Sequence, residues 1–326
     1  MIALWFSLVV LCWVLFFVLE GFDFGVGLLA PLLGRDDHER AAAVRTVGPF
    51  WDGNEVWLVA AIGVPFAAFP DWYAALLAGL YLPVVALLLL LAVRGVALEF
   101  RGKGDGVRWR RRCDALLAAS SAGIVIVWGA VLAACAHGLA LDSFGDVTGS
   151  GLSRSLSPVL TPAAAVGALA ALFAAALLGA TFLSLRTTGP IRQRAHRLAV
   201  ALSSGGALTL AVAAFALGSR VVLAAAVLCA GIGTVTRYGR EAVAFGGVAL
   251  GVAATVVAVF TIHGDVVLRS TLDPAWSLTM TGAASSPSAL RLLTVVAVIV
   301  LPGVLVYQAF SYWTFRRRVT SERIPS

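Results

Sequence analysis

The chain has 326 residues, of which 60% are hydrophobic and 13% are charged, and its mean hydropathy is +0.94. One soluble core cannot bury that much apolar surface, so the composition excludes an ordinary soluble domain and predicts a polytopic membrane protein. The net charge of +7 does not predict nucleic-acid binding, because the basic residues fall in short loops, where they set membrane orientation.

Apolar runs long enough to cross roughly 30 Å of hydrocarbon recur nine times along the chain. We expect spans near 3–33, 50–70, 72–98, 114–136, 162–185, 198–217, 220–236, 241–263 and 290–313. The seventh run is short, so eight spans with a re-entrant segment is the alternative. The stretches 137–161 and 264–289 are interpreted as connectors rich in Gly, Ser and Asp. We therefore expect an all-α transmembrane bundle, forming a single integral membrane domain over residues 1–326.

Lys and Arg are distributed unevenly between the two sides of this nine-span topology. The loops after spans one, three, five and seven, together with the tail, hold 19 of them, whereas the opposite side holds 4. Basic residues in short loops concentrate on the cytoplasmic side, which places the amino terminus outside and the carboxyl terminus in the cytoplasm. The alternation also favours an odd number of spans.

The same topology brings ionisable residues from the first three spans to one depth. Pairs of acids at i, i+3 lie on one helix face, and this applies in both the first and the second span. Charged residues inside spans usually mark ion or proton paths. The predicted layer consists of Glu20, Asp23, Asp52, Glu55, Arg94, Glu99 and Arg101.

Structural roles are the alternatives for individual residues. Asp52 is placed to be a helix N-cap, with Glu55 completing a capping box, and Arg94 would neutralise a buried acid. The glycines at 21, 25 and 27 are interpreted as close-packing positions between helices. The tryptophans at 51, 57, 72 and 313 fit an interfacial belt.

The sequence predicts neither a haem nor a metal site within this chain. A haem between membrane helices needs His or Met ligands at membrane depth. His38 and His196 fall in basic loops, and His137 and His263 fall at outer span ends. The last two could share a surface metal ion, but solvent-facing histidines are the favoured interpretation. The four cysteines are widely spaced and are read as small buried hydrophobic residues.

Three motifs and the carboxyl-terminal region resemble one known family. The motifs are LEGFDFGVG at 19–27, WDGNEVWL at 51–58 and RGVALEFR at 94–101. The stretch 277–286, with Pro302, Tyr307 and Trp313 in the last span, is similar as well. In this order they resemble subunit II of cytochrome bd-type quinol oxidases over essentially the full length.

The resemblance implies a respiratory complex of the bacterial inner membrane that oxidises quinol and reduces dioxygen to water. It implies a larger partner, subunit I, that carries two b-type haems and one d-type haem. It leaves open whether a small third subunit joins, whether a quinone binds this chain, and whether the substrate is ubiquinol or menaquinol. Lipid is the other expected partner.

The resemblance also assigns roles to residues of the acid layer. Asp52 matches the acid of the WDGN motif and is expected on a proton route from the cytoplasm, with Trp51 and Asn54 ordering water around it. Glu20 and Asp23 would tune this acid or form a second proton intake.

The remaining residues of the layer are assigned supporting roles. Arg94 would hold a neighbouring carboxylate ionised, and Glu99 matches a further charged position. Glu55 is Gln in some members of the family. Two other functions remain as alternatives, namely a cation-coupled secondary transporter that works alone and a purely structural membrane subunit.

Overall fold

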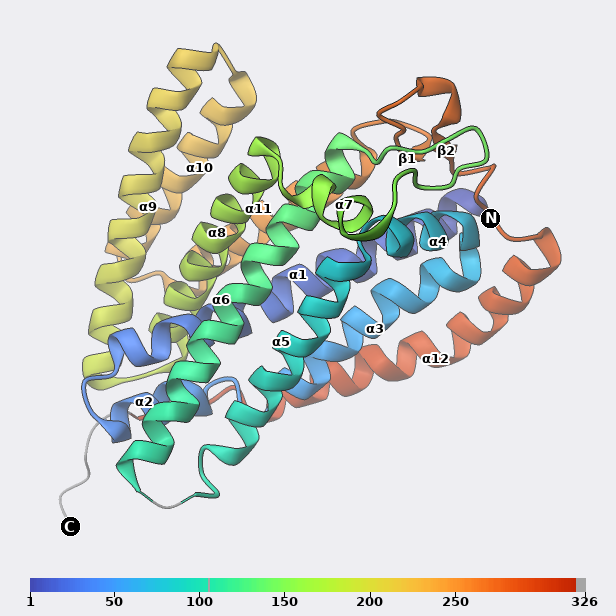
Figure 1. Cartoon of the computed structure of the whole chain (residues 1–326). Helices are drawn as coiled ribbons and strands as arrows, with labels where there is room; N and C mark the ends of the chain where they lie inside the picture. Colours follow the sequence, from blue (N-terminus) through green and yellow to red (C-terminus); the bar gives the residue numbers. More distant parts are fainter. Residues whose placement is uncertain (105, 321–326) are drawn as a thin grey trace.

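The computed structural model describes residues 1–104 and 106–320, and its helices form an elongated bundle (Figure 1). Two short antiparallel strands, β1 (Val266–Leu268) and β2 (Leu278–Thr279), lie at one end, and single 3-10 turns occupy Ser157–Val159 and Pro274–Trp276. The α-helices in these residues are α1 (Ile2–Leu33), α2 (Asp37–Arg45), α3 (Trp51–Ala68), α4 (Pro70–Gly79), α5 (Tyr81–Phe100), α6 (Val107–His137), α7 (Gly151–Leu156), α8 (Pro162–Arg186), α9 (Gly189–Leu217), α10 (Arg220–Arg237), α11 (Glu241–Thr261) and α12 (Pro287–Thr314). The all-α prediction is confirmed.

Eight of the helices in the described residues are long and apolar enough to cross a membrane, against nine predicted spans. They are α1, α5, α6, α8, α9, α10, α11 and α12. The predicted second span is α3, which falls short because Asp52, Asn54 and Glu55 make its first turns polar. It still packs along α1 and against α12 within the bundle (Figure 1). The predicted seventh span, which was the weakest, is α10 and qualifies by length and composition.

The predicted third span, 72–98, is not one continuous helix. It is divided into α4 and α5 at Leu80, whose φ of −122° and ψ of 23° are not helical. Pro83 explains the break, because in a continuous helix its ring would clash with the carbonyl of Gly79. Pro83 is instead accommodated in the first turn of α5, where a missing N–H costs nothing.

The regions predicted as plain connectors carry structure of their own. Residues 138–161 contain α7, and residues 264–286 contain β1 and β2. The two regions pair through Leu139, whose N–H donates to the Arg269 carbonyl at 3.0 Å and whose carbonyl accepts from Thr271 N–H at 2.9 Å. A cap therefore covers one end of the bundle.

Helix α1 lies at the centre and packs on α3, α6, α8 and α11. At Gly25 the backbone of α1 touches that of α8 at Gly179, and a Cβ on either residue would overlap the other helix. The close-packing interpretation of the glycines is therefore confirmed for this position. Trp57 and Trp72 are 2% and 1% exposed, so the interfacial-belt prediction is wrong for them.

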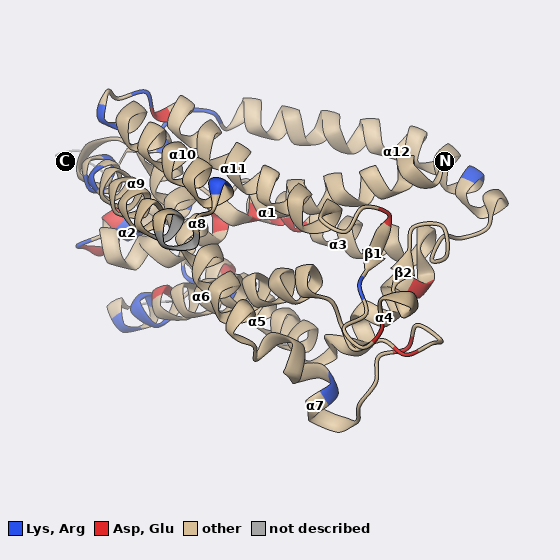
Figure 2. Ribbon diagram, turned by 90° about the horizontal axis from the view of Figure 1, so that it is seen from above, with Lys and Arg blue, Asp and Glu red and all other residues tan. Residues whose placement is uncertain are grey.

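The first helix begins and the last helix ends at opposite ends of the bundle. Trp5 Nε1 near the start of α1 donates to Thr294 Oγ1 near the start of α12 at 3.2 Å. After α12, Val319 N–H donates to the Arg186 carbonyl at the far end of α8 at 2.8 Å. This agrees with an odd number of passages, and most Lys and Arg lie at that far end (Figure 2). Membrane sidedness stays a prediction, and Arg323, part of the basic count, lies outside the described residues.

Candidate functional site: a buried carboxylate and arginine cluster

Glu20, Arg94 and Glu55 form a line of charges from the centre of the bundle to its surface. Glu20 on α1 and Arg94 on α5 are both 0% exposed. Arg94 Nη1 lies 3.7 Å from Glu20 Oε2 and 3.6 Å from Glu55 Oε1 on α3. The Glu55 side chain is 30% exposed, so one guanidinium joins a fully buried carboxyl group to one that reaches the surface.

Several polar atoms of this cluster have no hydrogen-bond partner within the described residues. These are both carboxyl oxygens of Glu20, Oδ1 of Asp23 and all three guanidinium nitrogens of Arg94. The Arg94 guanidinium also lies 4.9 Å from the centre of the Phe24 ring, a cation–π contact. Buried polar groups are normally hydrogen-bonded, and a functional role or a bound water molecule is among the explanations for an exception.

Asn54 links the cluster to α12. Its Nδ2 donates to Asp23 Oδ2 at 2.7 Å, and its Oδ1 accepts from Gln308 Nε2 at 2.8 Å and from Tyr312 Oη at 2.9 Å. Two donors on the same oxygen fix the orientation of the amide, so that its NH₂ group faces Asp23. Sequence reasoning missed Gln308 and Tyr312. The available signal was their i, i+4 spacing in an otherwise apolar helix.

The structure does not bring Asp52 or Glu99 into this cluster. Asp52 is exposed, and its side chain has no hydrogen bond or ion pair within the described part of the chain. The N-cap of α3 is Phe50 without a side-chain capping bond, so the capping alternative for Asp52 and Glu55 is wrong. Glu99 is half exposed and pairs with Lys103 at 3.3 Å. Trp51 packs beside Gly95 of α5.

A second charged network joins α2, the end of α5 and the start of α6. Arg101 Nε donates to Asp114 at 2.6 Å, and its Nη2 donates to Asp37 at 3.0 Å. Asp114 also pairs with Arg40 at 3.0 Å, and Asp37 with Arg110 at 2.8 Å. Burial opposes the charge on Arg101, yet its bonds to the two carboxylates raise the pKa of the guanidinium. The arginines that the sequence predicts as a topology signal therefore also join α2, α5 and α6 through ion pairs.

Glu39 on α2 makes a similar link to α9. Its carboxylate accepts from Arg194 Nη2 at 2.5 Å and from the Arg35 backbone N–H at 2.7 Å. Burial raises the pKa of the Glu39 carboxyl, but these two donors outweigh burial and bring the pKa below its ordinary value. The pair is therefore present as an ion pair at neutral pH.

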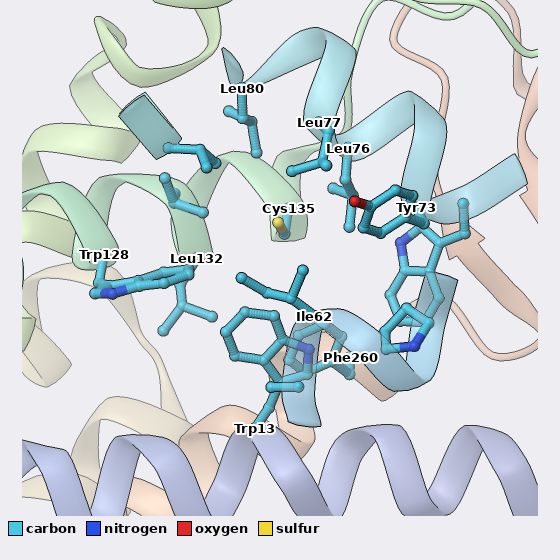
Figure 3. Close-up of a pocket in the computed structure, with 15 residues that line it drawn as sticks. Trp13, Ile62, Tyr73, Leu76, Leu77, Leu80, Trp128, Leu132, Cys135 and Phe260 are labelled. Carbon is cyan, nitrogen blue, oxygen red and sulfur yellow. The ribbon is translucent and has the colours of Figure 1, made fainter. Parts of the chain in front are cut away.

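An apolar cavity of about 60 Å³ lies nearer the capped end, between α1, α3, α4, α5, α6 and α11 (Figure 3). Trp13, Trp128 and Phe260 form part of its wall, and Cys135 and Tyr73 also face it (Figure 3). An apolar cavity that holds a benzene ring has about 150 Å³. This cavity is too small for a quinone ring, so it gives no support to a quinone bound by this chain.

The histidines of this chain do not fit a haem between the helices. His137 is the last residue of α6. His263 lies just after α11, and its Nε2 is 2.8 Å from the Ala136 carbonyl oxygen. His38 is on α2, and His196 lines a polar hollow near the start of α9. Over the residues described, no group of three His, Cys, Asp or Glu side chains is arranged to hold a metal ion.

The fold and the site define a polytopic helical membrane protein with a buried, incompletely paired carboxylate and arginine cluster. The family model described as cytochrome bd terminal oxidase subunit II matches residues 1–315. Cytochrome bd ubiquinol oxidase subunit 2 of Bacillus subtilis is 36% identical over 332 residues, covering 97% of this chain and 96% of the relative. Cytochrome bd-I ubiquinol oxidase subunit 2 of Escherichia coli strain K12 is 30% identical over 369 residues, covering 98% and 96%.

A solved structure has the same fold. A chain of the bd oxidase from Geobacillus thermodenitrificans matches with a TM-score of 0.67 at 10% identity, covering 96% of this chain and 98% of that one. The chain belongs to the cytochrome bd terminal oxidase subunit II family. It is a multi-pass protein of the bacterial inner membrane and one subunit of a respiratory oxidoreductase complex. Because the chain belongs to this family, the alternative hypothesis of a secondary transporter that works alone is wrong.

Proposed function

We propose that this chain supports a haem-bearing subunit I in a complex that oxidises quinol and reduces dioxygen to water, and that its buried acid cluster moves protons toward that partner. Both relatives are ubiquinol oxidase subunits, which supports quinol as the substrate class. The two b-type haems and the d-type haem are assigned to the partner, in keeping with the poor fit of this chain's histidines.

The observation that carries the proton proposal is the charge balance of the cluster. Three carboxyl groups, on Glu20, Asp23 and Glu55, face a single guanidinium on Arg94. Ionising all three would leave two uncompensated negative charges in a low-dielectric environment, which costs several kcal/mol per charge. The cluster therefore favours bound protons on carboxyl groups, and a proton held by one acid can pass to another.

The geometry supports a direction for this transfer. Glu55 is the one of the three with surface access, and Arg94 lies between it and Glu20. Asp23 lies one turn along α1 from Glu20 and is held by Asn54. We propose that Glu55 takes up the proton and that Glu20 and Asp23 form the buried relay. Arg94 positions both glutamates. Water molecules bridge the contacts that are longer than a hydrogen bond.

Asp52 has a different place in this proposal. It begins an exposed stripe along α3 that continues through Val56, Val59 and Phe66. The neighbouring α12 is the least buried of the candidate spans, because only 6% of its most apolar stretch is buried within this chain. A charge is costly against lipid, whereas a partner subunit can pair or hydrate it. We propose that this face meets subunit I and that Asp52 hands protons across the boundary.

Steady-state oxygen consumption with a quinol substrate tests the relay. We expect Glu20→Gln and Asp23→Asn to lower turnover at least about tenfold, because each removes a proton-carrying group from the route. Glu99→Gln is the matched control, since this acid is on α5 but outside the cluster. The reduced haem spectrum of each purified complex reports assembly.

The result separates a relay from a structural subunit. Normal turnover per haem in both variants would contradict the relay. Loss of haem with unchanged turnover per remaining haem would assign the cluster to assembly instead.

A further inference from the structure

A polar hollow of about 360 Å³ opens where α9, α10 and α11 meet, at the end of the bundle that holds most of the arginines (Figure 2). The first turns of α9 supply four lining residues, and the turn from α10 into α11 supplies two. Gly239 in that turn has a φ of +71°, which glycine adopts without strain. The lining residues are Arg192, Gln193, His196, Arg197, Gly239 and Glu241.

Glu241 forms the floor of the hollow and is only 5% exposed. Arg192 Nη2 lies 2.8 Å from its Oε1, and Arg318 Nη2 lies 2.8 Å from its Oε2. Ser184 Oγ donates to Oε1 at 3.2 Å. The carboxylate is therefore saturated, yet the Arg192 and Arg318 side chains remain 42% and 41% exposed. Arg192 Nε also donates to Oε1, at 2.9 Å, so within the described residues its Nη1 group is the one without a hydrogen bond, and it can meet a second anion.

The position of Arg318 is fixed by the fold. The segment after α12 pairs with the turn between α8 and α9, where Val319 N–H donates to the Arg186 carbonyl at 2.8 Å and Thr188 N–H donates to the Val319 carbonyl at 3.0 Å. Arg186 also donates to the Phe315 carbonyl. Arg318, which meets Glu241 from outside the hollow, is thus held by a side-chain hydrogen bond to the Phe315 carbonyl before it and by backbone hydrogen bonds at Val319 after it.

The charge of this site exceeds what Glu241 can neutralise. Arg192 and Arg197 line the hollow, and Arg318 pairs with Glu241 from outside it, so three arginines lie near one carboxylate. Guanidinium groups suit the planar, multi-oxygen geometry of phosphate. Val243 and Leu250, farther along the candidate membrane span α11, are 60% and 68% exposed. A basic pocket between membrane helices is typical of a site for an anionic lipid headgroup.

We infer that this hollow binds a phosphate group, with Arg192 and Arg197 as its cationic ligands. Two sources carry that chemistry. One is the headgroup of an anionic phospholipid whose acyl chains follow α11, and the other is free inorganic phosphate. The inference is independent of the proposed proton route, because it uses none of the residues of the buried cluster.

Lipid retention by the purified two-subunit complex tests the inference. Wild type, Arg197→Gln and Arg220→Gln are reconstituted in vesicles of equal parts phosphatidylglycerol and phosphatidylcholine, re-extracted in detergent, and analysed for bound phospholipid by mass spectrometry. Arg220 is the control because it is an exposed arginine at the opposite end of α10. We expect wild type and Arg220→Gln to retain phosphatidylglycerol in preference, and Arg197→Gln to retain about fivefold less at the same lipid concentration.

Equilibrium dialysis with radiolabelled inorganic phosphate supplies the second arm. If lipid retention is the same in all three complexes but phosphate binds and its binding falls in Arg197→Gln, the ligand is free phosphate. If neither ligand binds, or if both arginine variants change alike, the inference is wrong and the arginines serve only to neutralise Glu241. The reduced haem spectrum of each preparation shows that the complexes are assembled.

Discussion

Arg94→Gln removes the one cation of the buried cluster, and its consequences follow from two distances. Unit charges at the 3.6 and 3.7 Å measured for Glu55 and Glu20 interact by about 4 kcal/mol each at an effective dielectric constant of about 20. The Glu55 pair counts for less, because that side chain is 30% exposed and screened by solvent. Proton uptake by Glu20 limits the loss, so we expect about 3 to 5 kcal/mol, the usual result of breaking a buried pair.

The double variant Glu20→Gln with Arg94→Gln separates the ion pair from general disruption. It removes both charges, so we expect it to be more stable than Arg94→Gln alone by at least about 2 kcal/mol. The assay is the rate of thermal loss of the reduced haem spectrum in the assembled complex, because large membrane complexes unfold irreversibly. A loss of about 3 kcal/mol accelerates this decay by up to roughly a hundredfold. Wild-type stability in Arg94→Gln, or faster decay in the double variant, would refute the reasoning.

Three further predictions follow from other contacts. Gly25→Ala places a methyl group against the α8 backbone and should destabilise by about 1 to 3 kcal/mol, whereas Gly63→Ala, with nothing within 4 Å, should be neutral or slightly stabilising in the same thermal assay. Glu39→Gln should lower the stability at pH 7 by about 1 kcal/mol in the same assay. Because the folded-state pKa of Glu39 is depressed, this difference should be lost as the pH falls through that depressed pKa, and a difference that does not change with pH would contradict the ion pair. Tyr312→Phe removes one of two donors to Asn54 and should cost about 1 kcal/mol, while Asn54→Leu should cost more because it also strands Asp23; equal losses would contradict the central role of Asn54.

Apolar continuity made most of the fold predictable. The first span was expected over 3–33 and is α1 over Ile2–Leu33, because a long apolar run has few other ways to satisfy its backbone in lipid. The break at Leu80 was missed, because the residues around it are as apolar as the helices on either side. Pro83 was the local signal, and its steric demand decides the break.

The site was predictable in part. The sequence placed Glu20, Asp23, Glu55 and Arg94 at one depth, and the structure brings them together. The sequence could not show that Asp52 faces outward, because its direction depends on how α3 is rotated about its axis relative to α1.

The bonds from α12 to Asn54 join residues more than 250 positions apart, and hydropathy carries no information about them. Arg101 was expected in the charged layer and in the basic loop, and Asp114 at the start of a span; their direct pairing, which Arg40 of α2 joins, could not be read from the sequence because it depends on tertiary packing.

The most direct test of the central claim is proton uptake during a single turnover. The fully reduced complex is mixed with dioxygen in weakly buffered solution containing a pH indicator, and wild type is compared with Asp23→Asn and the Glu99→Gln control at equal haem content. The account predicts that uptake slows at least about tenfold in Asp23→Asn and is unchanged in Glu99→Gln. Uptake at the wild-type rate in Asp23→Asn would contradict a proton route through the buried cluster.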